Sequence, residues 1–210
     1  MINPEHKIAF IILSYLLGSI STSILVCKIK KVDIRSIGSG NAGATNTLRA
    51  LGKKYGALVL ILDFLKGFLP VLISKNMDSQ SMVLPICCAF ATVLGHVFPI
   101  FFSFKGGKGA ATFIGAIFAI FPIGALICTI IFIITLILSG FVGLSTICAA
   151  ISFPLSIYLF NQSDLLLFGI AAMMFILISH FKNIIRLIKG SENRFHKIHI
   201  FNSQSIWHKK

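Results

Sequence analysis

Three segments of this sequence combine glycine with hydroxyl, amide and cationic side chains, a pattern typical of anion-binding sites. The first segment reads GSGNAGATNTLR and runs from Gly38 to Arg49. Glycine lets the backbone turn with positive φ and direct its N–H groups at an anion, and the planar guanidinium of Arg49 suits a phosphate group. A flexible connection between helices is the alternative. We expect the anion-binding residues of this loop to be Ser39, Gly40, Asn41, Gly43, Thr45, Asn46 and Arg49.

The second segment, GHVFP followed by FKGGKGAAT, ends at the start of an apolar run. The backbone N–H groups at a helix N-terminus favour an anion, so this turn predicts a second part of the site. The spacing of a P-loop is absent because Gly109 follows Lys108, which argues against an ATPase. A positively charged helix boundary is the alternative. The candidate residues here are His96, Lys105, Gly106, Gly107, Lys108 and Gly109.

The third segment, HFKNIIRLIKGSEN, begins at His180. If one helix continues through it, His180, Asn183 and Arg186 lie near the same face. An ordinary basic helix end that reaches toward lipid headgroups is the alternative.

Asp63 and Lys66 lie three positions apart inside an apolar run. Residues at this spacing are neighbours on a helix, and a charge at the centre of a bilayer costs about 2.5–3.5 kcal/mol. We therefore expect the two side chains to pair with each other or with a partner on another helix. A structural lock and a role in substrate binding are both open.

Composition places these segments in a membrane protein. Only 12% of the 210 residues are charged and 56% are hydrophobic, whereas soluble domains carry about 25% charged and about 45–50% apolar residues. The net charge of +13 would suggest nucleic acid in a soluble chain, but here the basic residues lie between apolar runs. We predict an all-α integral membrane protein without a nucleic-acid partner.

Seven apolar runs predict seven transmembrane helices in one domain, residues 1–210. The run from 110 to 139 exceeds the roughly 20 residues that one helix needs, and Pro122 near its middle breaks helices. The predicted spans cover about 8–26, 55–73, 81–104, 110–121, 123–138, 141–160 and 165–185.

Basic residues concentrate after the first span, after the third span and in the tail. The positive-inside rule places these regions in the cytoplasm and the N-terminus outside. The tail returns to the cytoplasmic side only if an even number of crossings follows residue 105, which four spans satisfy. Five crossings with two re-entrant segments satisfy the same condition and remain an alternative. In both topologies the three polar segments share one membrane face.

Metal and redox chemistry find little support in the sequence. The six acidic residues are scattered, and the five cysteines lie in apolar stretches without metal-ligand spacing. Their odd number argues against a disulfide framework. We expect no metal and no cofactor.

Taken together, the three polar segments closely resemble the signatures of the bacterial acyl-phosphate-dependent glycerol-3-phosphate acyltransferases, the PlsY family. The LDFLKG run around Asp63 and Lys66 also resembles that family, and the resemblance extends from Gly18 to about Arg194. Ser191 is the main departure, because the family more often has Thr there. The tail after Lys197 matches nothing in the family.

The resemblance implies a seven-helix enzyme of the bacterial inner membrane whose active site faces the cytoplasm. It implies transfer of an acyl group from acyl phosphate to the 1-hydroxyl of sn-glycerol 3-phosphate, which gives lysophosphatidic acid and phosphate. The expected partners are these two substrates, membrane lipid and a soluble enzyme that forms acyl phosphate. The resemblance assigns Ser39, Arg49, Lys108, His180 and Asn183 to catalysis, Gly106 and Gly107 to the acyl phosphate, and Glu192 to substrate binding.

Acyl phosphate is an activated mixed anhydride, so positioning and charge stabilisation could suffice for its transfer. Either a substrate phosphate oxygen or His180 takes the hydroxyl proton. A small transporter of organic phosphates would share the basic segments and the Asp63–Lys66 pair. The chain shows no clear inverted repeat, which argues against a transporter.

Overall fold

The computed structural model describes residues 3–195, and this part of the chain is helical with no strand. The tail after Lys197 lies outside the described residues. The α-helices are α1 (Pro4–Gly18), α2 (Thr22–Ile29), α3 (Ala44–Leu51), α4 (Lys53–Met77), α5 (Val83–Val97), α6 (Ala110–Ile120), α7 (Pro122–Ser139), α8 (Val142–Leu159), α9 (Leu166–Ser179) and α10 (Phe181–Ile188). Short 3₁₀ helices are η1 (Ile34–Ser36), η2 (Ile100–Phe102) and η3 (Ser163–Leu165).

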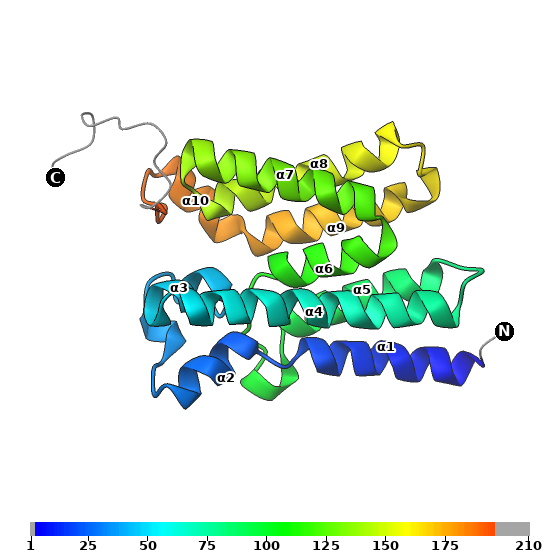
Figure 1. Cartoon of the computed structure of the whole chain (residues 1–210), viewed down its shortest axis with the longest axis horizontal. Helices are drawn as coiled ribbons and strands as arrows, with labels where there is room; N and C mark the ends of the chain where they lie inside the picture. Colours follow the sequence, from blue (N-terminus) through cyan, green and yellow to red (C-terminus); the bar gives the residue numbers. More distant parts are fainter. Residues whose placement is uncertain (1–2, 196–210) are drawn as a thin grey trace, which may run out of the picture.

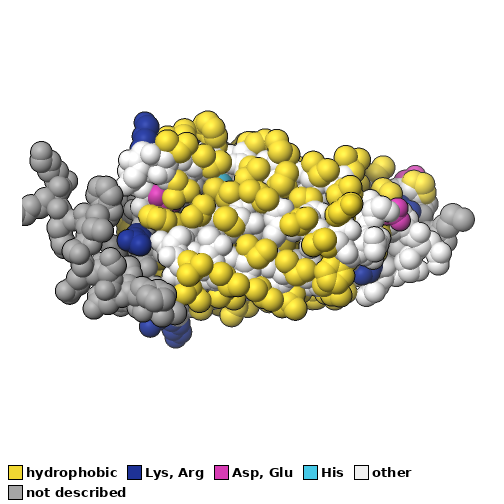
Figure 2. All heavy atoms as spheres, turned by 90° about the horizontal axis from the view of Figure 1, so that it is seen from above, with side chains coloured by type: hydrophobic (Ala, Val, Ile, Leu, Met, Phe, Trp, Pro, Cys, Tyr) yellow, Lys and Arg dark blue, Asp and Glu magenta, His cyan; other side chains and the backbone are white. Residues whose placement is uncertain are grey.

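The long helices run side by side along the long axis of the molecule (Figure 1). Helix α4 packs against α6, α1 packs against α5, and α7 and α9 pack against α8. The short helices α2, α3 and α10 gather at one end, and the N-terminus lies at the other (Figure 1). Hydrophobic side chains cover the middle of the face shown in Figure 2, and blue basic side chains are prominent at the end that carries α3 and α10. This distribution fits a protein whose central, apolar surface contacts the lipid of a membrane.

Within residues 3–195, five helical segments are long and apolar enough to cross a membrane: Pro4–Ile29, Lys53–Met77, Val83–Phe102, Pro122–Ser139 and Val142–Leu159. A bent pair, Ser163–Ser179 with Phe181–Ile188, could supply a sixth. Ala110–Ile120 is apolar but shorter. The predicted all-helical membrane architecture is therefore confirmed, whereas the count of seven crossings and the orientation of the termini stay predictions.

The predicted break at Pro122 is confirmed, because α6 ends at Ile120 and α7 begins with that proline at its first position. Proline is tolerated there since its missing N–H has no intrahelical partner. The first predicted span, 8–26, lies within the segment Pro4–Ile29, although its helix is interrupted between Gly18 and Thr22. The helix of the last predicted span, 165–185, is not straight but bends by 59° at His180. The helix of the third predicted span, 81–104, also ends early, at Val97.

Backbone contact between α4 and α6 explains how the centre of the bundle is held. A Cβ on Gly67 would lie 1.9 Å from the carbonyl oxygen of Thr112, and a Cβ on Gly115 would lie 2.1 Å from that of Phe64. Only glycine permits helices to approach this closely, as is common in membrane bundles. The contact places Asp63 and Lys66 of α4 beside the start of α6.

Candidate active site

A cavity of about 780 Å³ lies among α3, α4, α6, α7, α8 and α10 and has a polar mouth and an apolar arm. The mouth brings together residues from all three polar segments, although about 150 positions separate Ser39 from Glu192. The predicted site residues that line it are Ser39, Asn41, Gly43, Thr45, Asn46, Arg49, His96, Lys108, Gly109, His180, Asn183 and Glu192. Gly40, Lys105, Gly106 and Gly107 are not among the lining residues.

The first segment is part loop and part helix. The loop turns at Gly38 and Gly40, whose φ angles are +57° and +68°, as the glycine pattern predicts. The remainder was expected to be loop and instead forms α3 from Ala44 to Leu51. The helical turn places Thr45 and Arg49, four positions apart, toward the cavity.

Asn46 holds this loop in shape. Its Oδ1 accepts the backbone N–H of Ser39 at 3.1 Å, and its Nδ2 donates to the carbonyls of Ile34 at 3.0 Å and Ile37 at 2.9 Å. The side chain is 1% exposed. These bonds use both the oxygen and the nitrogen of the amide. Asn46 therefore positions Ser39 and is not free to bind a substrate, although it lines the cavity.

A chain of polar contacts connects the second and third segments. Lys108 donates its ammonium N–H to Asn183 Oδ1, and Asn183 Nδ2 donates to Glu192 Oε1 at 2.8 Å. Arg186 Nε pairs with Glu192 Oε2 at 2.7 Å. In this chain of contacts the Glu192 carboxylate is the one negative charge, against the three cations Arg49, Lys108 and Arg186. The net charge of the mouth is therefore positive, which suits an anion.

Burial changes the acidity of the cations at this mouth. Burial, followed by the positive charge of Arg186, lowers the pKa of Lys108 to about 8, while Glu192 acts in the opposite direction. Burial also lowers the pKa of Arg49 from its ordinary value, and Glu192 opposes that shift. Arginine stays charged at any pH of interest, so Lys108 is the cation whose charge can change near neutral pH.

His180 lies at the bend between α9 and α10 and is 4% exposed. Its Nδ1 lies 2.9 Å from the carbonyl oxygen of Ile176, and a carbonyl can only accept. Nδ1 therefore carries the proton, which leaves Nε2 as the acceptor of a neutral imidazole. Ser179 joins the bend to the second segment, since its hydroxyl donates to the carbonyl of Lys108 at 3.0 Å.

The glycines of the second segment serve packing in this structure. The N–H of Gly106 donates to the carbonyl of Val97 and that of Gly107 to the carbonyl of His96, both at 3.1 Å. A Cβ on Gly107 would lie 2.2 Å from His96 Nε2. The structure therefore does not direct these two N–H groups into the cavity. Lys105 is exposed, and its carbonyl accepts a hydrogen bond from Arg35 at 2.9 Å.

A buried polar cluster lies behind the mouth. Asp63 Oδ1 lies 3.0 Å from Lys66 Nζ and accepts the hydroxyl of Thr22 at 2.7 Å. His96 Nδ1 lies 3.6 Å from the same oxygen. Lys66 also donates to the carbonyl of Ile20 at 3.0 Å, a group that the break between α1 and α2 leaves without a helical partner. The predicted pair is therefore formed, and it also ties α4 to that break.

The apolar arm extends from the mouth between α4, α6, α7 and α8. Its walls are mainly hydrocarbon and aromatic, and its two threonine hydroxyls, Thr129 and Thr146, donate to backbone carbonyls of their own helices. The described residues of the arm therefore include no charged group, and the arm fits an acyl chain. Representative lining residues are Phe64, Phe113, Ile117, Phe132, Ile133 and Ala149.

The predicted site list omitted two charged residues that line the cavity, Asp63 and Arg186. Arg186 was noted only as a neighbour on the helix face, and its pairing with Glu192 depends on the turn at Gly190, where φ is +67°. Asp63 was identified as a buried charge, but its position beside the mouth was not. The spacing of Arg186 from Asn183 was the available signal. Among residues 3–195, no three His, Cys, Asp or Glu side chains gather as metal ligands would.

Residues 8–190 match the model of a protein family described as glycerol-3-phosphate acyltransferase. The glycerol-3-phosphate acyltransferase of Aquifex aeolicus is 46% identical over 187 residues, which cover 88% of this chain and 97% of that protein. The protein of the same name from Endomicrobium trichonymphae is 44% identical over 200 residues, with coverage of 94% and 98%.

Two crystal structures of PlsY, an integral membrane glycerol 3-phosphate acyltransferase, have the same fold. The glycerol 3-phosphate form superposes with a TM-score of 0.88 at 43% identity and covers 92% of this chain and 97% of that one. The lysophosphatidic acid form gives a TM-score of 0.86 at 42% identity, with the same coverage.

Proposed function

This chain belongs to the glycerol-3-phosphate acyltransferase family, and we propose that its acyl donor is an acyl phosphate. It is an integral membrane acyltransferase of phospholipid synthesis. In the proposed reaction, the 1-hydroxyl oxygen of sn-glycerol 3-phosphate attacks the acyl carbon. The bond between that carbon and the phosphate oxygen breaks, and lysophosphatidic acid and inorganic phosphate leave.

One observation carries the proposal: a single cavity joins a cationic mouth to an apolar arm. Both proposed substrates bear phosphate, which the charges of Arg49, Lys108 and Arg186 can neutralise. The acyl chain can lie in the arm with its carbonyl at the mouth. Holding two substrates in this way supplies effective molarity, which is worth up to about 7–11 kcal/mol of the barrier.

We assign phosphate binding to Arg49 and Lys108 and the ordering of Lys108 to Asn183. Ser39, which lines the same cavity as Arg49, would donate its hydroxyl to a phosphate oxygen or to glycerol. The hydroxyl proton of glycerol 3-phosphate passes to a substrate phosphate oxygen in our preferred route. His180 Nε2 is the rival acceptor, because Nδ1 already donates to Ile176.

The proposed mechanism uses no metal, since the side chains at the mouth supply the positive charge. We further propose that the site faces the cytoplasm across the bacterial inner membrane, as the basic segments around it favour. A soluble enzyme that forms acyl phosphate is the predicted source of the donor.

Phosphate release by the purified protein in detergent tests the proposal. With palmitoyl phosphate, sn-glycerol 3-phosphate and EDTA, we expect release that requires both substrates. Arg49→Ala should reduce release by at least about a hundredfold, whereas Lys54→Ala, an exposed cation outside the cavity, should leave it unchanged. A folded wild-type protein that uses only another acyl donor, or that needs a divalent metal, would contradict the proposal. Activity in detergent also excludes a transporter, which would require a sealed compartment.

A further inference from the structure

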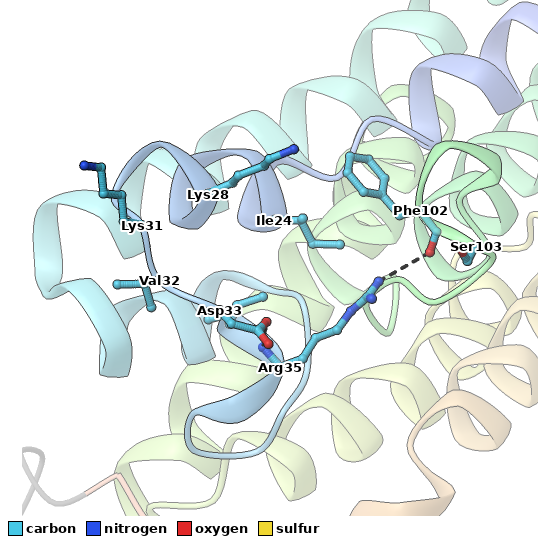
Figure 3. Close-up of a pocket in the computed structure, with 9 residues that line it drawn as sticks. Ile24, Lys28, Lys31, Val32, Asp33, Arg35, Phe102 and Ser103 are labelled. Atoms are coloured by element: carbon cyan, nitrogen blue, oxygen red, sulfur yellow. Dashed lines mark hydrogen bonds between the residues drawn. The ribbon is translucent and has the colours of Figure 1, made fainter.

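A second pocket, of about 500 Å³, lies at the same end of the molecule and shares no lining residue with the cavity described above. Its walls come from the end of α2, the following loop with η1, and the turn at Phe102 and Ser103 (Figure 3). Nothing in the proposed acyl transfer uses this pocket, so its chemistry calls for a separate account.

The pocket carries an excess of positive charge. Lys28, Lys31 and Arg35 line it and are exposed, against one carboxylate, Asp33. That carboxylate accepts the backbone N–H of Arg35 at 2.9 Å and so caps η1. An anion is therefore the favoured occupant.

Arg35 is held in place across the pocket. Its Nη2 donates to the carbonyl oxygens of Lys105 at 2.9 Å and Phe102 at 3.3 Å, and Figure 3 shows the side chain extended toward the Phe102–Ser103 turn. Within the described part of the chain both bonds use this one nitrogen, which leaves the N–H groups of Nε and Nη1 to bind a phosphate.

Apolar side chains accompany the cations. Ile24 and Val32 are half-buried in the pocket. Two residues next to lining residues in the chain are also exposed, Ile29 beside Lys28 at 78% and Phe101 beside Phe102 at 60%. A small soluble anion would contact the cations but leave these apolar groups uncovered. A phospholipid satisfies both, because its phosphate lies at the membrane interface and its acyl chains lie alongside.

We propose that this pocket binds the headgroup of an anionic phospholipid. Arg35 contacts the phosphate diester, Lys28 and Lys31 at the rim of the pocket attract it through their charge, and the glycerol and upper acyl carbons pack against Ile24 and the exposed surface of α2. The site is distinct from the acyl-transfer site, so its occupancy does not depend on which acyl donor the enzyme uses.

Native mass spectrometry of the purified full-length protein in neutral detergent, titrated with phosphatidylglycerol, tests this proposal. The double variant Lys28→Gln/Lys31→Gln should lower phosphatidylglycerol affinity by about tenfold or more, since each interfacial cation contributes separately. The matched control Lys53→Gln/Lys54→Gln removes the same charge from the start of α4 and should leave the affinity unchanged. Equal losses in both pairs, or none in the first, would overturn the proposal.

A second variant changes shape without changing charge. Ile24→Phe should fill the pocket and weaken phosphatidylglycerol binding while all three cations remain. Retained binding in Ile24→Phe would mean that the lipid does not enter the pocket. Phosphatidylcholine should bind more weakly than phosphatidylglycerol, and inorganic phosphate at millimolar concentration should not compete. Effective competition by inorganic phosphate would identify a soluble phosphate site in place of the lipid. Acyl transfer in detergent should be unchanged in these variants, which verifies that they are folded.

Discussion

Lys108 donates a hydrogen bond from its ammonium to the side-chain oxygen of Asn183, across 75 positions of the chain. The bond joins the glycine-rich turn before α6 to α10, and the amide nitrogen of Asn183 in turn donates a hydrogen bond to Glu192. The amide therefore orients the one cation of the mouth that is free to lose its charge near neutral pH. Asn183 is 4% exposed and Lys108 is half-buried, so this contact is partly shielded from water.

Replacing Asn183 with Ala should leave Lys108 without its partner and disorder its ammonium. We expect kcat/KM for glycerol 3-phosphate to fall by about 10- to 100-fold, as is typical when a positioned charge is lost. Steady-state phosphate release measures this. Lys182→Ala, an exposed neighbour on the same helix, is the matched control. A comparable loss of kcat/KM in both variants would mean that the substitutions disturb α10 as a whole, and would contradict a specific role for Asn183.

The pKa of Lys108 leads to a prediction of how activity depends on pH. Its pKa is lowered to about 8, so the side chain is cationic at pH 7 and largely neutral at pH 9. Because only the cation attracts phosphate, kcat/KM should be level below pH 7.5 and fall up to about tenfold per pH unit above pH 8. Lys108→Arg keeps its charge and should abolish the alkaline fall, at lower overall activity. An unchanged alkaline limb in that variant would assign the titration to another group.

His180→Gln separates the two routes for the hydroxyl proton. Gln cannot act as a general base but can donate and accept hydrogen bonds. If a substrate phosphate takes the proton, the variant should keep near-normal turnover and a level profile from pH 6 to 7.5. A loss of about 100-fold or more in kcat, with KM unchanged, would favour His180 as the base.

Gly107→Ala tests the close approach of the second segment to α5. The added Cβ would meet His96 Nε2 at 2.2 Å and the carbonyl oxygen of Ala42 at 2.5 Å, so His96 and the first loop must move. We expect a loss of activity and a lower melting temperature. Gly52→Ala is the control, because φ there is +87° but nothing lies within 4 Å. That substitution should cost about 1 kcal/mol in strain and preserve activity.

The Asp63–Lys66 pair should behave as a buried lock. Asp63→Asn leaves Lys66 charged without its partner and should lower stability by about 3–5 kcal/mol. The double variant Asp63→Asn/Lys66→Met should recover part of that loss, which thermal unfolding in detergent can measure as a coupling. Asp78→Asn breaks the partly exposed pair with Lys7 and should cost at most about 1 kcal/mol. Independent, additive losses at Asp63 and Lys66 would contradict the lock.

The sequence by itself determined the membrane class, the helical architecture and the break at Pro122. These follow from local properties: apolar composition makes lipid the solvent, and backbone groups in lipid must be satisfied within helices. Proline disfavours the interior of a helix, and the break falls at Pro122, whereas Pro70 and Pro154 are accommodated inside α4 and α8. The spacing of Asp63 and Lys66 also predicted their contact, because residues three apart on a helix are neighbours.

Only the tertiary structure decided how backbone and side-chain hydrogen bonds are shared between distant segments. The loop before Arg49 becomes α3 because its polar side chains, such as Asn46 and Thr47, find partners in η1 and α2. The N–H groups of Gly106 and Gly107 are taken by the end of α5, and the last span bends at His180. Arg186 enters the site only because Glu192 folds back onto it. Each of these outcomes depends on which partner lies nearest in space, and that is set by helix packing, which no single segment encodes.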